Sequence, residues 1–340
     1  MEINIEELKK IKITPLLDSL KLEDFSDEEY FGKKYKDYIS NSRLGLLKNK
    51  GAKAFFEGLG SSEYNPSFFF GSLLHQQYLE PGVSNIIEGV YTPTAKARLM
   101  ALELYKSDGS TPTDDEIKSA SYKVGYYKDK LTANRIAELR EKCNPFWRDR
   151  FLYEQNNSPK GDELYIDEKS YNLLKMCMDS IKNNKEFDKL IHPDYIVEEP
   201  YSANEHTILL DIQAEIPGYE PRIYKLKSKL DNFTIDKEEN TITVNDLKTT
   251  SKLAKEFDPT YFSYQREIGM YIFMLSLVAK KFFNLEKPKI AGNFLVVSIV
   301  PDYNSLVYPM TNKLFKSGLA EFKYLLKTAI YLNIVKGYEF

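Results

Sequence analysis

Asp246 and Lys248 lie two residues apart in the segment "TVNDLKTT" (243–250), which otherwise has the pattern of a buried strand. Side chains at positions i and i+2 of a strand point to the same face, so this carboxylate and this ammonium lie side by side while Leu247 faces the other way. One interpretation is an ion pair on an edge strand, which contributes little to stability. The alternative is that the pair takes part in chemistry.

A further carboxylate precedes this pair at the end of "RIYKLKSKLDNF" (222–233). The short turn-like segment "DKEEN" (236–240) predicts that the two strands are antiparallel neighbours, so Asp231 and Asp246 can approach each other. Two carboxylates that meet at one point bind a hard divalent cation such as Mg²⁺ or Mn²⁺. Beside such a cation, Lys248 could orient the attacking water or hold a scissile phosphate, which is the chemistry of phosphodiester hydrolysis.

The strand that ends at Asp231 carries a row of cations. The alternation of the strand places these side chains on one face, which could be a solvated surface or a site of contact with DNA phosphates. The row consists of Lys225, Lys227 and Lys229.

The elements that must position these residues follow from hydrophobic periodicity. The first 90 residues are expected to be mostly helical, with Ser40 or Ser42 as the N-cap of one helix. A helical insertion is expected over residues 95–190, and helices over 261–283 and 311–332. A period of two predicts strands at 195–202, 207–216, 222–233, 241–250 and 291–300. This order predicts an α/β fold, a central mixed β-sheet flanked by helices, in one domain spanning residues 1–340.

Composition narrows the class of protein. The chain has 340 residues, of which 42% are apolar and 29% are charged, as in a soluble globular protein. Its net charge of −3 lacks the basic excess common in nucleic-acid-binding proteins, although a groove can be locally basic. Cys143 and Cys177 are too few for a disulfide framework or a four-cysteine metal site, which favours a reducing, cytoplasmic setting. The apolar segment 268–279 is too short to span a bilayer, so no membrane role is expected.

Four segments together resemble a known family. They are "GSLLHQQYLEP" (71–81), "KSKLDNF" (227–233), "NDLKTT" (245–250) and "YQREIGMY" (264–271). In their order and spacing they resemble the PD-(D/E)xK nuclease superfamily, and within it the exonucleases of the lambda-exonuclease, RecE and RecB-nuclease type. The resemblance covers roughly residues 40–100 and 195–300 and implies a restriction-endonuclease-like core.

The resemblance assigns a role to each matching residue. Asp231 and Asp246 match the two motif acids that hold the metal, and Lys248 matches the catalytic lysine. His75 matches a helical histidine near the metal, and Gln265 matches a glutamine near the active site. The family usually has a tyrosine four residues after that glutamine, whereas this chain has Gly269 there, with Tyr271 two residues further on.

The remaining metal ligands are also implied by the resemblance. The backbone carbonyl of Leu247 is expected to contribute, and many relatives add a glutamate from a strand before the first aspartate. Glu215 is the expected glutamate, with Glu199 as the alternative. A histidine on an apolar helix face can also be a packed core residue, so the alternative for His75 is a structural role.

The resemblance therefore predicts a Mg²⁺- or Mn²⁺-dependent exonuclease that resects double-stranded DNA ends in phage replication or recombination. It implies a homo-oligomer and a single-strand annealing protein as a partner, in the cytoplasm of a bacterial host. A structure-specific or nicking endonuclease, and a catalytically idle DNA-binding protein of the same fold, are the alternatives.

Overall fold

The computed structural model describes residues 5–58, 66–81, 85–88, 95–106, 108–126, 131–156, 163–166, 168–191, 201–260 and 263–339. The chain divides into two compact units, of which unit 1 comprises Met1–Ser62 and Ser180–Phe340 and unit 2 comprises Glu63–Asp179. Unit 2 is thus inserted into unit 1, and it begins earlier in the chain than the helical insertion expected at 95–190.

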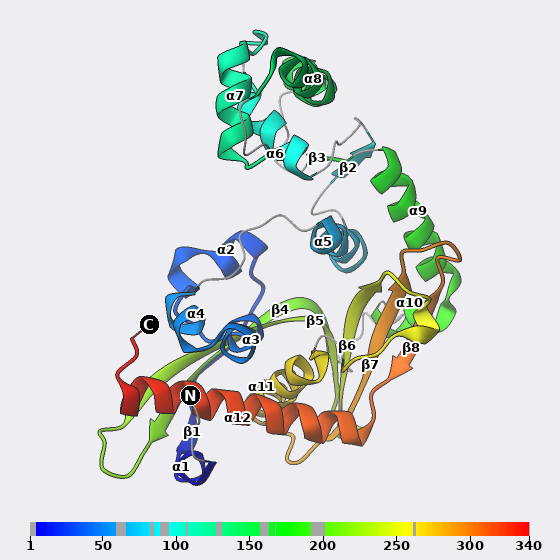
Figure 1. Ribbon diagram of the computed structural model, residues 1–340. Coiled ribbons are helices and arrows are strands. Elements are labelled where there is room, and N and C mark those ends of the chain that lie inside the picture. Colours follow the sequence, from blue (N-terminus) through cyan, green and yellow to red (C-terminus); the bar gives the residue numbers. More distant parts are fainter. Residues whose placement is uncertain are drawn as a thin grey trace. The chain divides into compact units, whose positions relative to one another are not determined.

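Unit 1 contains the large β-sheet and the helices that cover it (Figure 1). Its elements are α1 (Ile5–Lys9), β1 (Lys12–Glu23), α2 (Asp27–Phe31), the 3₁₀ helix η1 (Lys33–Tyr35), α3 (Asn41–Lys50), α4 (Ala52–Glu57), α10 (Lys185–Ile191), β4 (Tyr201–Glu215), β5 (Arg222–Asp236), β6 (Thr241–Thr250), the 3₁₀ helix η2 (Ala254–Glu256), α11 (Tyr264–Phe283), β7 (Lys289–Ser298), β8 (Ser305–Pro309) and α12 (Asn312–Lys336).

The sheet of unit 1 has six strands in the order β1-β4-β5-β6-β7-β8. Four of the neighbouring pairs are antiparallel, whereas β6 and β7 are parallel and α11 connects them. A parallel pair needs such a crossover, because the chain must return to the same end of the sheet. The predicted α/β fold with a central mixed sheet and flanking helices is confirmed.

The helices α11 and α12 pack against each other at their glycines. A Cβ atom built on Gly269 would lie 2.2 Å from the backbone of Gly318, and one built on Gly318 would lie 1.8 Å from the carbonyl oxygen of Gln265. No side chain fits at either position, so the two backbones are in direct contact. This contact explains why position 269 of this chain is a glycine.

The pairing of β5 with β6 ends partway along both strands. Their last paired residues are Asn232 and Asn245, whereas β6 continues beside β7 as far as Thr250. On the other side of this split, Ile39 bonds to the edge of β5: its N–H donates to Lys225 O (2.7 Å), and its carbonyl accepts from Lys227 N (3.0 Å). The sheet therefore opens where Asp231 and Asp246 follow the last pair.

The largest difference from the sequence prediction in unit 1 is β1. Residues 12–23 lie in the part of the chain expected to be mostly helical, but they form an edge strand that pairs with β4 and shifts register between Leu16 and Lys21. Most of its side chains are only half-buried, so the sequence lacks a clean alternation of apolar and polar residues. Of the two candidate caps, Ser40 is the N-cap of α3, because its hydroxyl accepts from Arg43 N. Most of the strand expected at 195–202 lies outside the described residues.

Unit 2 is mostly helical, and it also contains a small two-stranded parallel sheet formed by β2 and β3. Its elements are α5 (Pro66–Leu79), β2 (Asn85–Glu88), α6 (Ala95–Leu104), α7 (Asp114–Lys123), α8 (Ala133–Asn156), β3 (Glu163–Ile166) and most of α9 (Glu168–Asn183).

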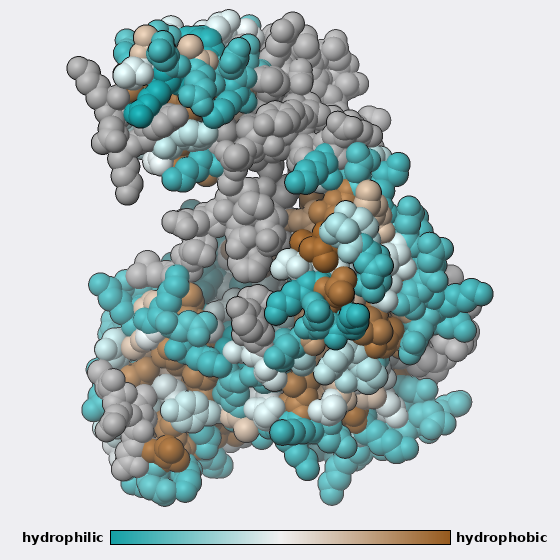
Figure 2. Space-filling view, turned by 45° about the vertical axis from the view of Figure 1, so that its right-hand side comes forward, coloured by the Kyte–Doolittle hydropathy of each residue, from teal (hydrophilic) through white to brown (hydrophobic). Residues whose placement is uncertain are grey.

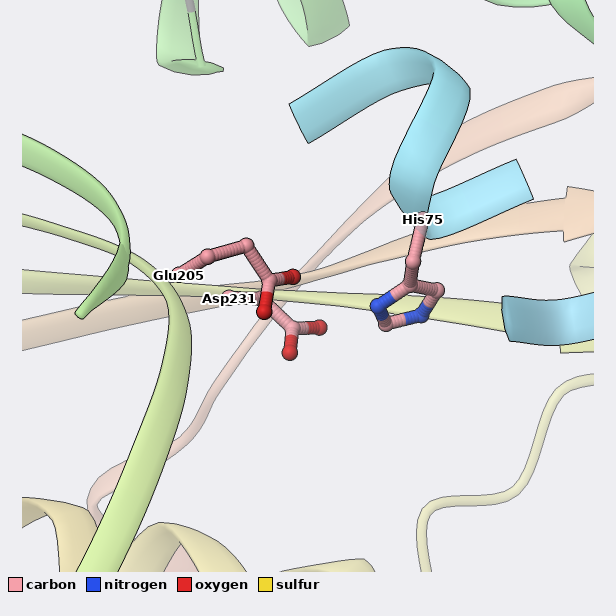
Figure 3. A group of neighbouring side chains, drawn as sticks. All are labelled: His75, Glu205 and Asp231. Carbon is pink, nitrogen blue, oxygen red and sulfur yellow. The ribbon is translucent and has the colours of Figure 1, made fainter. Parts of the chain in front are cut away.

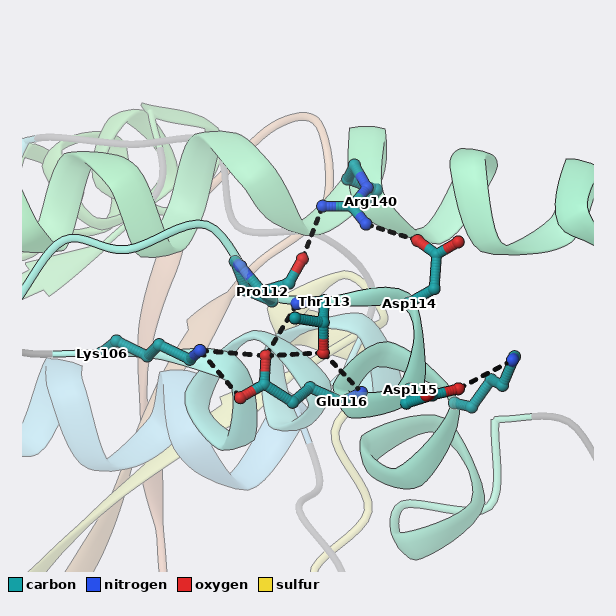
Figure 4. A network of polar contacts seen from close by, with 8 residues as sticks. Lys106, Pro112, Thr113, Asp114, Asp115, Glu116 and Arg140 are labelled. Carbon is teal, nitrogen blue, oxygen red and sulfur yellow. Dashed lines mark hydrogen bonds and ion pairs between the residues drawn. The ribbon is translucent and has the colours of Figure 1, made fainter.

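The helices of unit 2 are joined by the polar network around the start of α7 (Figure 4). Thr113 caps α7, and the Glu116 carboxylate accepts in return from Thr113 N (2.7 Å) and pairs with Lys106. The hydrogen bond from Lys106, with those from Thr113, lowers the pKa of Glu116 to about 2. Arg140 of α8 donates to Pro112 O and to Asp114 (2.6 Å each), which attaches α8 to α7. These contacts give Lys106, Asp114, Glu116 and Arg140 a structural role in holding the helices of unit 2 together.

Hydrophilic residues cover most of the described surface on the face drawn in Figure 2, and hydrophobic residues appear there in smaller patches. Most large apolar side chains of the described residues lie in the cores of the two units. Among the helices in the described part of the chain, none combines the length and the apolar character required to cross a bilayer.

Candidate metal centre

The split between β5 and β6 brings Asp231 beside Leu247. Because the strands are no longer paired here, Leu247 N has no backbone acceptor on β5. It donates instead to Oδ2 of the Asp231 carboxylate (2.7 Å). The N–H and C=O of one residue in an extended strand point to the same side, so the Leu247 carbonyl also faces the split. Asp231 and the Leu247 carbonyl, both predicted ligands, are therefore directed to the same place.

Asp246 and Lys248 form a buried ion pair on the next strand. The Asp246 side chain is completely buried, and its Oδ2 lies 2.7 Å from Lys248 Nζ. Lys248 Nζ also lies 3.4 Å from Glu267 Oε2, in the first turn of α11, and 5.0 Å from the centre of the Tyr264 ring. A buried pair with a second carboxylate partner is not the surface ion pair that was the alternative explanation of this motif.

The charges of this cluster interact strongly. Burial raises the pKa of Asp246 well above its usual range, and the charges of Asp231 and Glu267 act in the same direction against the influence of Lys248. Burial alone would lower the pKa of Lys248, but Asp246 and Glu267 outweigh it, and the pKa is raised. The carboxylates of the cluster therefore exceed the cations that face them.

Glu205 is the glutamate that lies beside Asp231. The two residues lie between the paired residues Asn204–Asn232 and His206–Leu230 of β4 and β5. A carboxylate oxygen of each lies within 4.8 Å of the other (Figure 3). Glu205 has a positive φ of 53°, which is uncommon outside glycine and turns the strand locally. Both side chains are buried, and Lys229 Nζ lies 3.0 Å from Glu205 Oε2.

The structure does not bring Glu215, the expected additional acid, to Asp231. Glu215 lies at the opposite end of β4 from Glu205, about 30 Å away at about 3.3 Å per residue. Its carboxylate pairs with Lys12 on the edge strand β1. The alternative, Glu199, lies outside the described residues.

The donors of this site suit a hard divalent cation. Glu205, Asp231, Asp246 and the Leu247 carbonyl offer oxygen atoms, which are the ligands that Mg²⁺ and Mn²⁺ prefer. Asp246 Oδ1 is buried and has no hydrogen-bond partner among the described residues. A buried carboxylate oxygen without a donor is costly, and a cation would satisfy it.

His75 belongs to unit 2, where it lies on α5 with its side chain partly buried. Imidazole nitrogen is an accepted ligand of Mn²⁺-type ions, so the chemistry of this side chain allows the predicted role.

Gln265, predicted to lie near the active site, is on the first turn of α11 and donates from Nε2 to Glu321 Oε2 of α12 (3.0 Å). Tyr271, on the same helix, is almost fully buried, and burial raises its pKa, followed by the charges of Glu267, Asp246 and Asp231. The hydrogen bond to Glu321 thus joins Gln265 to α12, and its predicted place near the active site stays a prediction.

The three lysines of β5 do not form the exposed cationic row that the alternation suggested. Lys227 is buried, and its Nζ donates to Tyr30 O of α2 (2.6 Å). Lys229 is occupied by Asp27 (2.7 Å) and Glu205. Lys225 is exposed and lies over the ring of Tyr38. Lys227 therefore binds α2, and Lys229 binds both α2 and Glu205. Of the three lysines, only Lys225 is accessible to a phosphate.

Sequence reasoning missed Glu205 and Glu267. The pattern "NEHTILL" places Glu205 just before a run of apolar strand residues, and an acid at that position was the available signal. Glu267 lies two residues after Gln265, on the first α-helix after the Asp246 strand. Their position beside Asp231 and Lys248 depends on how β4 and α11 pack, which the local pattern does not contain.

No protein-family model matches the chain, and no curated protein matches it either. A crystal structure of a protein from Eubacterium rectale, described as a putative exonuclease, is similar to this chain with a TM-score of 0.45 and 10% sequence identity. The match covers 91% of this chain and 86% of that protein.

Proposed function

We propose that the protein is a divalent-metal-dependent deoxyribonuclease, and that it acts as an exonuclease on double-stranded DNA ends. The observation that carries this proposal is the set of acids at the split of the sheet, Glu205, Asp231 and Asp246, with the Lys248 ammonium 2.7 Å from Asp246. In this proposal the acids hold a hard cation with the Lys248 ammonium beside it, an arrangement that can hydrolyse a phosphodiester.

Each residue of the site has a task in this proposal. Glu205, Asp231, Asp246 and the Leu247 carbonyl would hold Mg²⁺ or Mn²⁺. When bound, such an ion supplies charge stabilisation at the phosphorus oxygens and favours ionisation of a water. Lys248, held between Asp246 and Glu267, donates hydrogen bonds to the attacking water or to a phosphate oxygen.

His75 is proposed as a further ligand or as a group that contacts the substrate near the metal. If so, His75→Ala would reduce Mn²⁺ binding or cleavage at an unchanged content of folded protein. A variant that merely melts earlier, with normal activity per folded molecule, would instead assign His75 to the packing of α5. Gln76→Ala, one residue further along the same helix and also partly buried, is the matched control.

The phosphate contacts are reassigned to cations that are exposed. Lys33, Lys34 and Lys36 are exposed in and after η1, directly beyond the helix α2 whose Asp27 pairs with Lys229. Together with Lys225 they offer charges that can neutralise a DNA backbone. Replacing Lys33 and Lys34 by Ala should weaken DNA binding and reduce its dependence on salt. Lys287→Ala, at an exposed position between α11 and β7, is the control and should change neither.

The assay that tests the proposed function compares two DNA substrates in Mg²⁺. End-labelled linear duplex should be degraded to mononucleotides or short oligonucleotides, while a covalently closed circle of the same sequence survives. Chelation of the metal and the variant Asp246→Asn should each abolish the degradation without unfolding the chain.

The other outcomes separate the alternatives. A circle that is cut as fast as the linear duplex would replace the exonuclease by an endonuclease. DNA binding without cleavage of either substrate, identical in the wild type and in Asp246→Asn, would indicate an idle DNA-binding protein. The homo-oligomer and the single-strand annealing partner stay predictions of the family resemblance.

A further inference from the structure

A continuous row of asparagine side chains crosses four strands of the sheet at the point where it splits. Asn293 Nδ2 donates to Asn245 Oδ1 (2.9 Å), Asn245 Nδ2 donates to Asn232 Oδ1 (2.8 Å), and Asn232 Nδ2 donates to Asn204 Oδ1 (2.7 Å). These four residues, Asn204, Asn232, Asn245 and Asn293, are called the asparagine ladder. It joins β4, β5, β6 and β7 by side chains alone.

The ladder is fully hydrogen-bonded at its centre. Asn232 and Asn245 are almost completely buried, and the second donor of Asn245 reaches Leu190 O on α10 (3.2 Å). Asn232 Nδ2 also lies 3.4 Å from Ser202 Oγ. Each amide donates in the same direction along the row, and such chains of hydrogen bonds strengthen one another in a low-dielectric interior. Buried polar networks of this kind fix a geometry when every member is satisfied.

Each ladder residue on β4, β5 and β6 is the chain neighbour of one acid of the site. Asn204 precedes Glu205, Asn232 follows Asp231, and Asn245 precedes Asp246. Successive residues of a strand point to opposite faces, so the ladder lies behind the acids, toward α10, while Asp246 faces Glu267 of α11 through Lys248.

The acids need such a support, because the backbone does not provide one. Backbone pairing of β5 and β6 ends at the ladder residues Asn232 and Asn245, and the acids come one residue later. Carboxylates close together repel one another, and this repulsion would push the two strands apart. The ladder is the last set of hydrogen bonds between β5 and β6 before the site.

We propose that the asparagine ladder is a positioning device that fixes the separation of Asp231 and Asp246 across the split. Its members are positioning residues, since they act through the neighbouring acids. The inference deepens the proposed metal site, but the placement of Asp231 can be measured without any metal, through the hydrogen bond from Leu247 N to Asp231 Oδ2.

The test is amide hydrogen exchange of Leu247 in Asn245→Asp, measured by NMR without added metal. Aspartate preserves the shape of the side chain but cannot donate to Asn232 Oδ1 or to Leu190 O. If the ladder positions the acids, Leu247 N–H exchanges about tenfold faster or more in the variant, while the amides of β7 are unchanged. Unchanged exchange of Leu247 in a folded variant would overturn the proposal.

Two further variants separate positioning from general stability. Asn293→Ala removes a donor at the half-buried end of the ladder. It is the milder variant to use if Asn245→Asp fails to fold, and it should also speed the exchange of the Leu247 amide. Thr234→Val is the matched control, because Thr234 Oγ1 bonds Ser202 Oγ across the same two strands, two residues from Asn232 and away from the split. It should lower the melting temperature without changing exchange of Leu247, and equal acceleration in this control would contradict the inference.

Titration with Mn²⁺ provides the second readout. Loss of supporting hydrogen bonds behind metal ligands typically weakens the metal by about 10- to 100-fold, and we expect this for Asn245→Asp but not for Thr234→Val. If the wild type binds no Mn²⁺, the proposed metal site fails, and exchange of Leu247 still decides whether the ladder positions Asp231. Unchanged Mn²⁺ affinity in a folded Asn245→Asp would overturn the proposal.

Discussion

Asp246 and Lys248, two residues apart on β6, form an ion pair of 2.7 Å in which the carboxylate is completely buried. A second carboxylate, Glu267, lies 3.4 Å from the same ammonium. Burying an ion pair costs much of what the attraction returns, so stability alone gives little reason to place one here. In the proposed function, Asp246 would bind the metal ion and Lys248 would be the cationic donor beside it.

The first prediction concerns Lys248. Lys248→Met retains most of the length of the side chain but removes the charge, so Mn²⁺ should still bind while DNA cleavage falls by about 100-fold or more. Single-turnover cleavage rates and calorimetric Mn²⁺ titration measure the two effects. Lys252→Met removes the charge of an exposed lysine just after β6 and is the control; it should leave the cleavage rate unchanged. A cleavage rate close to that of the wild type would exclude Lys248 from the reaction.

A second prediction distinguishes the two glutamates of β4. Glu205→Gln should weaken Mn²⁺ binding by about tenfold or more, which corresponds to about 1.4 kcal/mol, because it removes a carboxylate beside Asp231. Glu215→Gln makes the same chemical change at the other end of the same strand and should leave the Mn²⁺ affinity unaltered. Equal effects of the two variants would remove Glu205 from the site.

The third prediction tests the contact between α11 and α12. Gly318→Ala places a methyl group against the carbonyl of Gln265, so we expect a loss of roughly 2 kcal/mol or more in the free energy of unfolding. The gain in helix propensity from glycine to alanine, about 1 kcal/mol, acts in the opposite direction. Urea unfolding measures the difference, with Ser317→Ala, an exposed position on the same turn, as the control. A variant as stable as the wild type would show that the two helices can move apart freely.

The fourth prediction is a dependence of stability on pH that comes from Lys227. Burial, with a smaller contribution from Arg43, lowers the pKa of Lys227 from 10.5 to about 8. Between these values the unfolded chain binds more protons than the folded one, so the contribution of Lys227 to stability rises with pH from about 8 to 10.5. Lys227→Met lacks this increase.

Urea unfolding at about pH 7 and about pH 10 tests the effect of Lys227. The stability difference between wild type and Lys227→Met should shift in favour of the wild type at the higher pH, by about 1 to 3 kcal/mol. Lys225→Met, at an exposed position of the same strand, should show no such shift. A difference that is independent of pH would mean that Lys227 titrates in the folded protein as it does in the unfolded chain.

The sequence by itself determined the identity of the central strands and of the pair on β6. The alternation at 241–250 predicts a strand with Asp246 and Lys248 on one face, and the structure has both features. The spacing of the two hairpin strands also places Asp231 near Asp246, because an antiparallel hairpin fixes which residues stand opposite each other. These features depend on residues close together in the chain.

The tertiary structure alone decided which other side chains lie near this pair. Glu205 rather than Glu215 stands beside Asp231, because the position along β4 is set by its register with β5. Lys227 is buried and Lys229 is partly buried, because α2 covers the β5 edge left free by the split, although their alternation is that of a solvated face. Glu267 reaches Lys248 through the packing of α11. Strand periodicity reports which face a residue occupies, and only the packing of distant segments decides what lies on that face.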